Sequence, residues 1–269
     1  MTKNDDDRMG ELPMFARDLA RAAGDAIQPH FRRVGEVDNK AASGFDPVTA
    51  ADRAAETVMR DMISRRFPED GILGEEFGAV PSRSGRIWVL DPIDGTRSFI
   101  CGLPTWTTLI GLMDGDEAVL GVVSQPFIGE LFIGGPFGSW SENRFGAVRL
   151  HVRPGVDLGG AILTTVAPEI YATDFQRRVL TAMQLSTRML RFGGDAYFFA
   201  MLAAGNVDIA MDAGLAAYDI AALVPIIRNA GGVVTTWDGG PAARGGDIIA
   251  ASGPALHARA LAVINSVRE

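Results

Sequence analysis

Cysteine is almost absent from this sequence, and Cys101, the single residue of this type, leaves no partner for a disulfide bond within the chain. A catalytic thiol is disfavoured, since no histidine and asparagine arrangement is recognisable beside Cys101, and the favoured interpretation is a small, partly buried thiol. No apolar run approaches the ~20 residues that span a bilayer. Residues 1–8 are polar and acidic, unlike the apolar core of a signal peptide. We therefore expect a cytoplasmic protein with no membrane partner.

Positive charge is also in short supply. Lys and Arg total 25 against 33 Asp and Glu, which gives a formal net charge of −8. This balance argues against a nucleic-acid partner, because such binding depends on neutralising phosphates with Lys and Arg. A small anionic ligand remains compatible with it, since a bound cation can invert the local field.

The chain has 269 residues, 47% of them hydrophobic, which allows one large domain or two modest ones that share a core. The first half is expected to be α+β. Apolar residues at helical spacing predict one helix over residues 11–33 and a second from Thr49 to about Phe67. Polar segments at 35–48 and 78–86 are expected to be turns and loops. Strands are expected at 87–90, 106–113, 117–125 and 130–134.

The second half alternates between the two kinds of element, which predicts an α/β unit with helices packed on a sheet. Strands are expected at 161–166, 187–192, 207–211, 232–237 and 247–251, and helices at 172–185, 194–204, 218–230 and 254–267. Gly205 and Gly231 stand where helix C-caps belong. We expect two subdomains, residues 1–152 and residues 153–269.

Residues 88–96, Trp-Val-Leu-Asp-Pro-Ile-Asp-Gly-Thr, form the most informative segment. A short buried strand delivers Asp91 and Asp94 into a turn. If Gly95 and Thr96 begin a helix, their N–H groups form a phosphate cradle. The two carboxylates would then seat cations beside the phosphate, and their hard oxygen ligands select Mg²⁺. On spacing alone, a turn whose Asp side chains only cap the backbone is an equal alternative.

Further acids lie before and after this segment. Glu75 and Glu76 follow a glycine, Asp52 lies one turn into the second helix, and Asp219 begins the helical stretch near residue 218. Each has a structural alternative. Asp52 and Asp219 would complement helix macrodipoles, and Glu75 would be a solvated loop charge.

Taken in order, these segments resemble the inositol monophosphatase superfamily. That family has a Val-Thr-x-x-Asp element, a Gly-Glu-Glu element, an Asp-Pro-Ile-Asp-Gly-Thr element, a Trp-Asp helix start and a downstream Gly-rich segment. The matching residues here are 48–52, 74–76, 91–96, 218–219 and 230–234. Tyr218 replaces the Trp of many members, an aromatic for an aromatic. The resemblance covers roughly residues 12–265 and implies a five-layered α/β/α/β/α sandwich.

The resemblance also implies two or three Mg²⁺ ions per active site. Glu75, Asp91 and the backbone carbonyl of Ile93 would hold the first ion. Asp91, Asp94 and Asp219 would hold the second, and a third, weaker site would share Glu75. Such metals fit phosphoryl transfer, which needs mostly positioning and charge stabilisation.

The resemblance assigns the chemical step to Thr96, Asp52 and Glu75. Thr96, helped by Asp52, would orient and deprotonate the attacking water, while the N–H groups of Gly95 and Thr96 hold the phosphate. No covalent phosphoenzyme is required.

Two stretches, residues 97–112 and 218–227, resemble bacterial histidinol-phosphate phosphatases of this superfamily more than inositol monophosphatases. The second contains Pro225, which should kink or break a helix. They imply hydrolysis of L-histidinol phosphate in histidine biosynthesis. One alternative is an inositol or other sugar-type monophosphatase. Another is a binding or regulatory protein without useful catalysis, which the retained acids disfavour because buried unpaired charges are costly without metals.

The family's substrate-contacting positions correspond here to Gly194, Asp195, Ala196 and Asp212. Members often carry a neutral Thr or Ser where Asp195 stands, so this chain is expected to place two carboxylates around the leaving group. Histidinol phosphate, which carries an ammonium and an imidazole, suits such a site better than a polyol does. The alternative is that Asp195 caps the following helix and points away. Relatives are commonly dimers, so the resemblance implies a homodimer.

Overall fold

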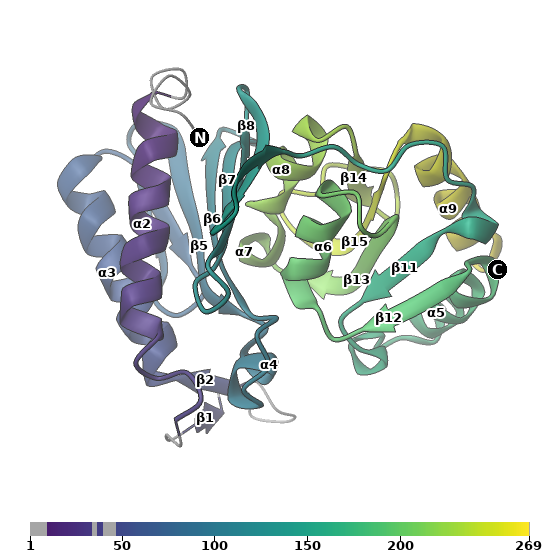
Figure 1. The fold of residues 1–269 in the computed structure, drawn as a ribbon, viewed down its shortest axis with the longest axis horizontal. Helices are drawn as coiled ribbons and strands as arrows, with labels where there is room; N and C mark the ends of the chain where they lie inside the picture. Colours follow the sequence, from purple (N-terminus) through teal and green to yellow (C-terminus); the bar gives the residue numbers. More distant parts are fainter. Residues whose placement is uncertain (1–9, 34–36, 40–46, 269) are drawn as a thin grey trace.

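The computed structural model describes residues 10–33, 37–39 and 47–268. Two β-sheets alternate with three layers of helices, which confirms the expected five-layered α/β/α/β/α sandwich (Figure 1). The helices are α2 (Glu11–Ile27), α3 (Ala50–Arg66), α4 (Thr96–Ile100), α5 (Asp174–Ser186), α6 (Asp195–Ala203), α7 (Ala217–Ile220), α8 (Leu223–Asn229) and α9 (Pro254–Ser266). Within the described ranges, no helix is both long and apolar enough to cross a membrane.

The first sheet has eight strands in the order β10-β9-β8-β7-β6-β5-β3-β4. They are β3 (Gly71–Gly74), β4 (Gly78–Val80), β5 (Arg86–Asp94), β6 (Thr107–Asp114), β7 (Glu117–Gln125), β8 (Glu130–Gly135), β9 (Gly138–Asn143) and β10 (Gly146–Arg149). Only β3 and β5 run parallel, and every other neighbouring pair is antiparallel. Helices α2 and α3 cover its outer face (Figure 1).

The second sheet has the order β12-β11-β13-β15-β14. Its strands are β11 (Ile162–Thr165), β12 (Met189–Phe192), β13 (Ile209–Leu215), β14 (Val233–Thr236) and β15 (Gly246–Ala251), and two short 3-10 helices precede and follow β11, η1 (Leu158–Gly160) and η2 (Pro168–Ile170). Helices α6, α7 and α8 lie between the two sheets, and α5 and α9 cover the far face (Figure 1). The proposed subdomain boundary falls in the connection between β10 and η1.

Two segments expected to be loops contain strands. β4 begins the segment 78–86, where it pairs with β3 at the edge of the sheet. Within 35–48, β1 (Val37–Asn39) pairs with β2 (Pro47–Thr49) as a separate two-stranded ribbon. Gly35 and Gly44, the turn glycines of this segment, lie outside the described residues. Strands this short carry too few residues to show an alternating pattern.

The first helix is shorter than predicted. It ends at Ile27, and turns follow it up to residue 33. Arg32 has a φ of 59°, which a helix does not tolerate. Its guanidinium lies 4.6 Å from the ring centre of Phe127 and donates from Nε to the Gly102 carbonyl oxygen at 3.0 Å. These distant contacts turn the chain out of the helix.

The single helix expected over 218–230 is divided into α7 and α8 by a turn at Ala221 and Ala222. Pro225 is the third residue of α8. The first four N–H groups of a helix have no acceptor within it, so proline is tolerated there. The helix is therefore interrupted, as predicted. The interruption lies at Ala221 and Ala222, directly before the first turn of α8, which contains Pro225. Gly205 and Gly231 follow helix ends with φ of 77° and 95°, as expected of C-cap glycines.

Three glycines let these short helices lie directly on the first sheet. Gly121 pairs with Gly111 on one side and with Gly134 on the other. A Cβ added at Gly121 would clash with the carbonyl oxygen of Ala222, and one at Gly134 would clash with the backbone of Ile226. The glycine row therefore sets how closely α7, which carries Asp219, approaches β5.

Candidate active site

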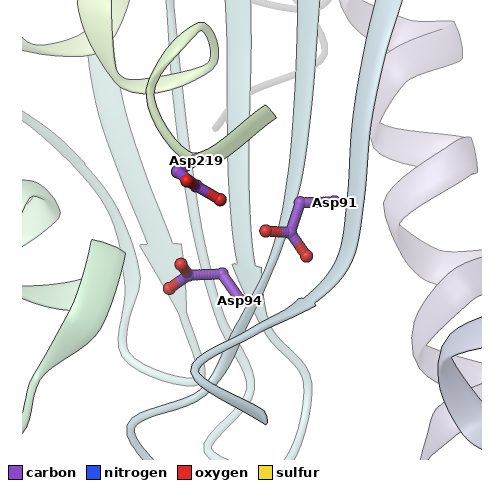
Figure 2. Close-up of side chains that lie close together, drawn as sticks. All are labelled: Asp91, Asp94 and Asp219. Carbon is purple, nitrogen blue, oxygen red and sulfur yellow. The ribbon is translucent and has the colours of Figure 1, made fainter. Parts of the chain in front are cut away.

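A β-bulge brings Asp91 and Asp94 together at the end of β5. In a regular strand, residues three apart point to opposite faces. The register between β5 and β6 shifts between these two residues, so that one extra residue of β5 stands opposite Thr108. The Thr108 hydroxyl donates to the Pro92 carbonyl oxygen at 2.8 Å, inside the bulge. Bulges commonly re-aim side chains at functional sites, and here both carboxylates reach the same space (Figure 2).

Asp219 reaches the same space from the layer between the sheets. It lies in the first turn of α7, where one oxygen accepts a hydrogen bond from the Ala216 N–H at 2.7 Å. Asp91, Asp94 and Asp219 each offer an oxygen, and these atoms lie within 4.8 Å of one another. Figure 2 shows the three side chains converging.

The electrostatics of this cluster call for a cation. Burial raises the pKa of Asp91 well above its usual value, and the charges of Glu75, Asp94 and Asp219 add to the effect. Burial also raises the pKa of Asp94, with contributions from Asp195 and Asp219. Asp91 Oδ1 is buried and accepts no hydrogen bond from the described residues. Buried carboxylates with a vacant oxygen are the ligands that a divalent cation such as Mg²⁺ requires, so the residues fit the metal.

Glu75 lies beside Asp91, because its N–H donates to the Leu90 carbonyl oxygen at 3.2 Å across the parallel pair β3 and β5. It stands outside the group of three carboxylates within 4.8 Å, although its charge contributes to the raised pKa of Asp91. The Ile93 carbonyl oxygen accepts a hydrogen bond from the Thr96 hydroxyl at 3.0 Å. The assignment of Glu75 and Ile93 as ligands stays a prediction.

Gly95 and Thr96 begin a helix, which is the condition for the expected phosphate cradle. Gly95 is the N-cap of α4, with a φ of 77°. A Cβ added there would lie 2.9 Å from Asp195 Oδ2, so both the backbone conformation and the close approach require glycine. Phosphate binding by these N–H groups stays a prediction.

Asp52 caps its own helix. Its Oδ2 accepts hydrogen bonds from the Thr49 N–H at 2.8 Å and from the Thr49 hydroxyl at 2.5 Å. Its Oδ1 is buried and has no hydrogen-bond partner in the described part of the chain. Burial raises the pKa of Asp52, Thr49 opposes the shift, and Glu75 adds to it. No described hydrogen bond joins Asp52 to Thr96, so their joint role stays a prediction.

Asp195, the first residue of α6, lies beside the segment that carries Asp94 and Ser98. Its carboxylate accepts a hydrogen bond from the Ser98 hydroxyl at 3.0 Å, while the Ala196 N–H donates to Asp94 Oδ2 at 2.8 Å. Asp195 has a φ of 44°, unusual for a residue with a side chain. No side chain caps α6, whose N-cap is Gly194. Burial raises the pKa of Asp195, and Ser98 and Arg97 oppose the shift.

Asp212 lies in β13 and is 3% exposed. It accepts hydrogen bonds from the Thr165 hydroxyl at 2.6 Å and from the Val166 N–H at 2.8 Å. Burial raises its pKa to about 7, with contributions from the charges of Asp195 and Asp219. Five aspartates therefore influence one another electrostatically around this site. They are Asp91, Asp94, Asp195, Asp212 and Asp219.

The sequence did not reveal the hydrogen bonds of Thr108 with Pro92 and of Ser98 with Asp195, or the full burial of Glu56 on α3. Nothing local marks the first two, because their partners are distant in sequence. Glu56 left a signal, since a charged residue four positions after Asp52 lies on the apolar face of α3. Cys101 is exposed, so the expectation of a partly buried thiol was wrong. It follows α4, where the chain turns at the surface.

Comparisons with known proteins agree with this geometry. The model of the Inositol monophosphatase family matches residues 9–269. The chain is 34% identical to a histidinol-phosphatase of Mycobacterium tuberculosis, over 94% of this chain and 97% of that protein. It is 35% identical to the bifunctional phosphatase IMPL2 of Arabidopsis thaliana, over 85% of this chain and 66% of that protein.

A solved structure extends the agreement to three dimensions. An inositol monophosphatase from Zymomonas mobilis superposes with a TM-score of 0.84 at 35% identity, over 98% of this chain and 100% of that one. The bulged strand, the converging carboxylates and the family match over nearly the whole chain lead to one conclusion. The chain is a phosphatase of the inositol monophosphatase family.

Proposed function

We propose that this chain is a Mg²⁺-dependent phosphomonoesterase whose substrate is L-histidinol phosphate, which it hydrolyses to L-histidinol and phosphate. The observation that carries the substrate assignment is the excess of buried acid. Asp195 and Asp212 lie beyond the three-carboxylate cluster and are close enough for one charge to raise the pKa of the other. A cationic leaving group would relieve this excess.

The chain's own residues supply the parts of a phosphate-ester site. Asp91, Asp94 and Asp219 would hold the metal, with Glu75 beside them. Mg²⁺ bound there would lower the pKa of a coordinated water and neutralise charge that develops on the ester oxygens. The N–H groups at the start of α4 would orient the phosphate.

Thr96 and Asp52 would handle the proton of the attacking water. The Thr96 hydroxyl is already oriented by the Ile93 carbonyl oxygen, to which it donates at 3.0 Å. Asp52 Oδ1 is buried and accepts no hydrogen bond from the described chain, which leaves it able to receive a proton. This arrangement is consistent with general base catalysis.

The charge argument favours histidinol phosphate over a polyol phosphate. Two unit charges about 4 Å apart interact by roughly 4 kcal/mol at an effective dielectric near 20, before desolvation. A third of that would give ~10-fold discrimination. The similarity to a histidinol-phosphatase over most of both chains supports the same substrate.

An inositol or sugar-type phosphate is the second candidate, and the similarity to the Zymomonas mobilis inositol monophosphatase favours it. The deciding measurement is kcat/KM with Mg²⁺ for L-histidinol phosphate, inositol 1-phosphate and glycerol 2-phosphate. We expect L-histidinol phosphate to give the highest value. A higher value for inositol 1-phosphate would replace the leading candidate with the second.

Variants of the two additional acids test the reason for the preference. Asp195→Asn and Asp212→Asn should raise KM for L-histidinol phosphate more than KM for glycerol 2-phosphate. The exposed Asp174, on α5, provides a control, because Asp174→Asn should change neither. Equal effects on both esters would show that these acids do not recognise the amine. Absence of phosphate release from every ester, with Mg²⁺ bound, would favour a binding or regulatory role.

A further inference from the structure

Glu56 is a buried carboxylate on α3 that the proposed reaction does not use. Its exposed fraction is 0%, and it lies one turn after Asp52 on the same helix. Arg60 donates from Nε to Glu56 Oε1 at 2.7 Å. Acidic side chains are almost never fully buried unless they are paired. Besides pairing with Arg60, Glu56 also accepts hydrogen bonds from the backbone.

Both oxygens of Glu56 bind the turn that follows β3. The Glu76 N–H donates to Oε2 at 2.7 Å, and the Phe77 N–H donates to Oε1 at 3.2 Å. The Arg60 guanidinium also donates to the Gly78 carbonyl oxygen. The ion pair therefore holds the whole connection between β3 and β4.

Gly74, the last residue of β3, makes this close approach possible. A Cβ added at Gly74 would clash with Glu56 Oε1. Glu75 comes next, and its own N–H donates to the Leu90 carbonyl oxygen of β5. The backbone around Glu75 is thus fixed by β5 on one side and by Glu56 on the other.

We propose that Glu56 is a positioning residue of the metal site: it holds the turn that places Glu75 beside Asp91, and in this way it sets the affinity for Mg²⁺. The inference rests on the proposed metal-dependent function. Groups that orient metal ligands without contacting the metal typically contribute about 10–100-fold to metal affinity or activity. Glu56 would act through backbone amides, without touching metal or substrate.

Asp70 provides a matched control, because it is a buried acid at the opposite end of β3. It is 5% exposed and accepts hydrogen bonds from Trp88 Nε1 at 3.1 Å and from the Ser84 hydroxyl at 2.7 Å. Both acids anchor an end of the same short strand, but only Glu56 binds the end that carries Glu75. Asp70→Asn should therefore reduce stability and leave metal affinity unchanged.

The test is calorimetric titration of the full chain with Mg²⁺ in the absence of substrate, for the wild type, Glu56→Gln and Asp70→Asn. We expect Glu56→Gln to raise the Kd for Mg²⁺ by about 10–100-fold, and Asp70→Asn to keep the wild-type Kd. Urea unfolding of each variant separates loss of the fold from loss of affinity. Saturating Mg²⁺ should restore most of kcat to Glu56→Gln. Glu56→Asp retains the charge beside Arg60 but withdraws the oxygens, so an intermediate Kd is expected even where Glu56→Gln does not fold.

The outcomes separate the two proposals. Wild-type Kd values in the Glu56 variants would overturn the positioning role and leave the proposed function intact. Equal losses of affinity in Glu56→Gln and Asp70→Asn would also overturn it, since stability of β3 would then explain both. A wild-type chain that does not bind Mg²⁺ would overturn the proposed function, and the positioning role with it.

Discussion

Asp91, in β5 of the first sheet, and Asp208, directly before β13 of the second sheet, are both buried aspartates, but the chain neutralises only Asp208. Asp208 is 0% exposed, and Arg153 donates to its Oδ1 from Nε at 2.8 Å. Its Oδ2 accepts the Ile162 N–H at 2.7 Å. Asp91 is 2% exposed, and no arginine or lysine of the described chain pairs with it.

The difference teaches how to distinguish a structural acid from a ligand. Asp208 has both oxygens satisfied by the chain, so it stabilises the connection into the second sheet. Asp91 is surrounded by other acids, one of its oxygens is unsatisfied, and its pKa is raised well above the usual value by burial and their charges. A buried acid of the second kind is stable in its charged form only when a cation comes from solution.

Removal of metal should have the largest effect on activity. It affects only the acids that depend on a cation, such as Asp91, and leaves the Asp208–Arg153 pair unchanged. Exhaustive dialysis against a chelator should abolish phosphate release, a loss of at least about 10³-fold, since metal ions supply several kcal/mol of transition-state stabilisation. Added Mg²⁺ should restore activity. The Asp208 pair needs no metal, so circular dichroism should show an intact fold throughout. Undiminished turnover after dialysis would refute the metal mechanism.

The next largest effect should come from exchanging single acids for amides. Asp94→Asn removes the charge of a proposed metal ligand and should lower kcat by about 10²–10⁴-fold. Without metal, the variant should be at least as stable as the wild type, because the repulsion between Asp94 and the neighbouring carboxylates is removed. Asp208→Asn should do the reverse and cost about 1–2 kcal/mol, because the buried side chain loses charge-assisted hydrogen bonds, whereas Arg153, whose side chain is 41% exposed, stays solvated. Steady-state kinetics and urea unfolding of both variants test this crossover, and a stability loss in Asp94→Asn alone would contradict it.

The sequence predicted the three clustered carboxylates better than their surroundings, and it did not single out Asp208. The motif order indicated that Asp91, Asp94 and Asp219 would meet, because short motifs carry their own local geometry. It did not reveal the bulge opposite Thr108, since register depends on the pairing strand. It likewise did not reveal the contact of Asp195 with Ser98, residues 97 positions apart. Local patterns are silent on contacts that only tertiary packing creates.

A moderate effect is expected from the glycine row under the α7–α8 segment, which sets where Asp219 meets Asp91. Gly121→Ala would clash with the Ala222 carbonyl oxygen and force the α7–α8 segment away from the sheet. Overpacking of this kind costs typically about 1–3 kcal/mol. The displaced Asp219 should also weaken Mg²⁺ binding in a calorimetric titration. Gly159→Ala is the control, because an added Cβ there meets nothing within 4 Å. Unchanged Mg²⁺ affinity in Gly121→Ala would show that Asp219 tolerates the shift.

The smallest effect should come from His257, a buried titratable group on α9. It is 7% exposed, and its Nε2 lies 2.9 Å from the Thr235 hydroxyl. Burial lowers the pKa of His257 below its usual value, so the unfolded chain binds the proton more readily than the folded chain. Its contribution to stability is therefore present above about pH 6.5 and is lost as pH falls below that value.

His257→Gln removes this titration while keeping a group that can hydrogen-bond Thr235. The variant should be less stable than the wild type at about pH 8 by no more than roughly 0.5–1.5 kcal/mol, the net contribution of one hydrogen bond. The difference should narrow toward about pH 5. At that pH the unfolded wild-type chain binds a proton at His257 more readily than the folded chain does, so the wild type loses stability and the variant does not. Urea unfolding with chelator present at both pH values measures this difference without a contribution from metal binding. His30→Gln is the control, because His30 is exposed and surface changes usually stay within about 0.5 kcal/mol. A difference between wild type and His257→Gln that stays constant with pH would show that His257 does not contribute to acid sensitivity.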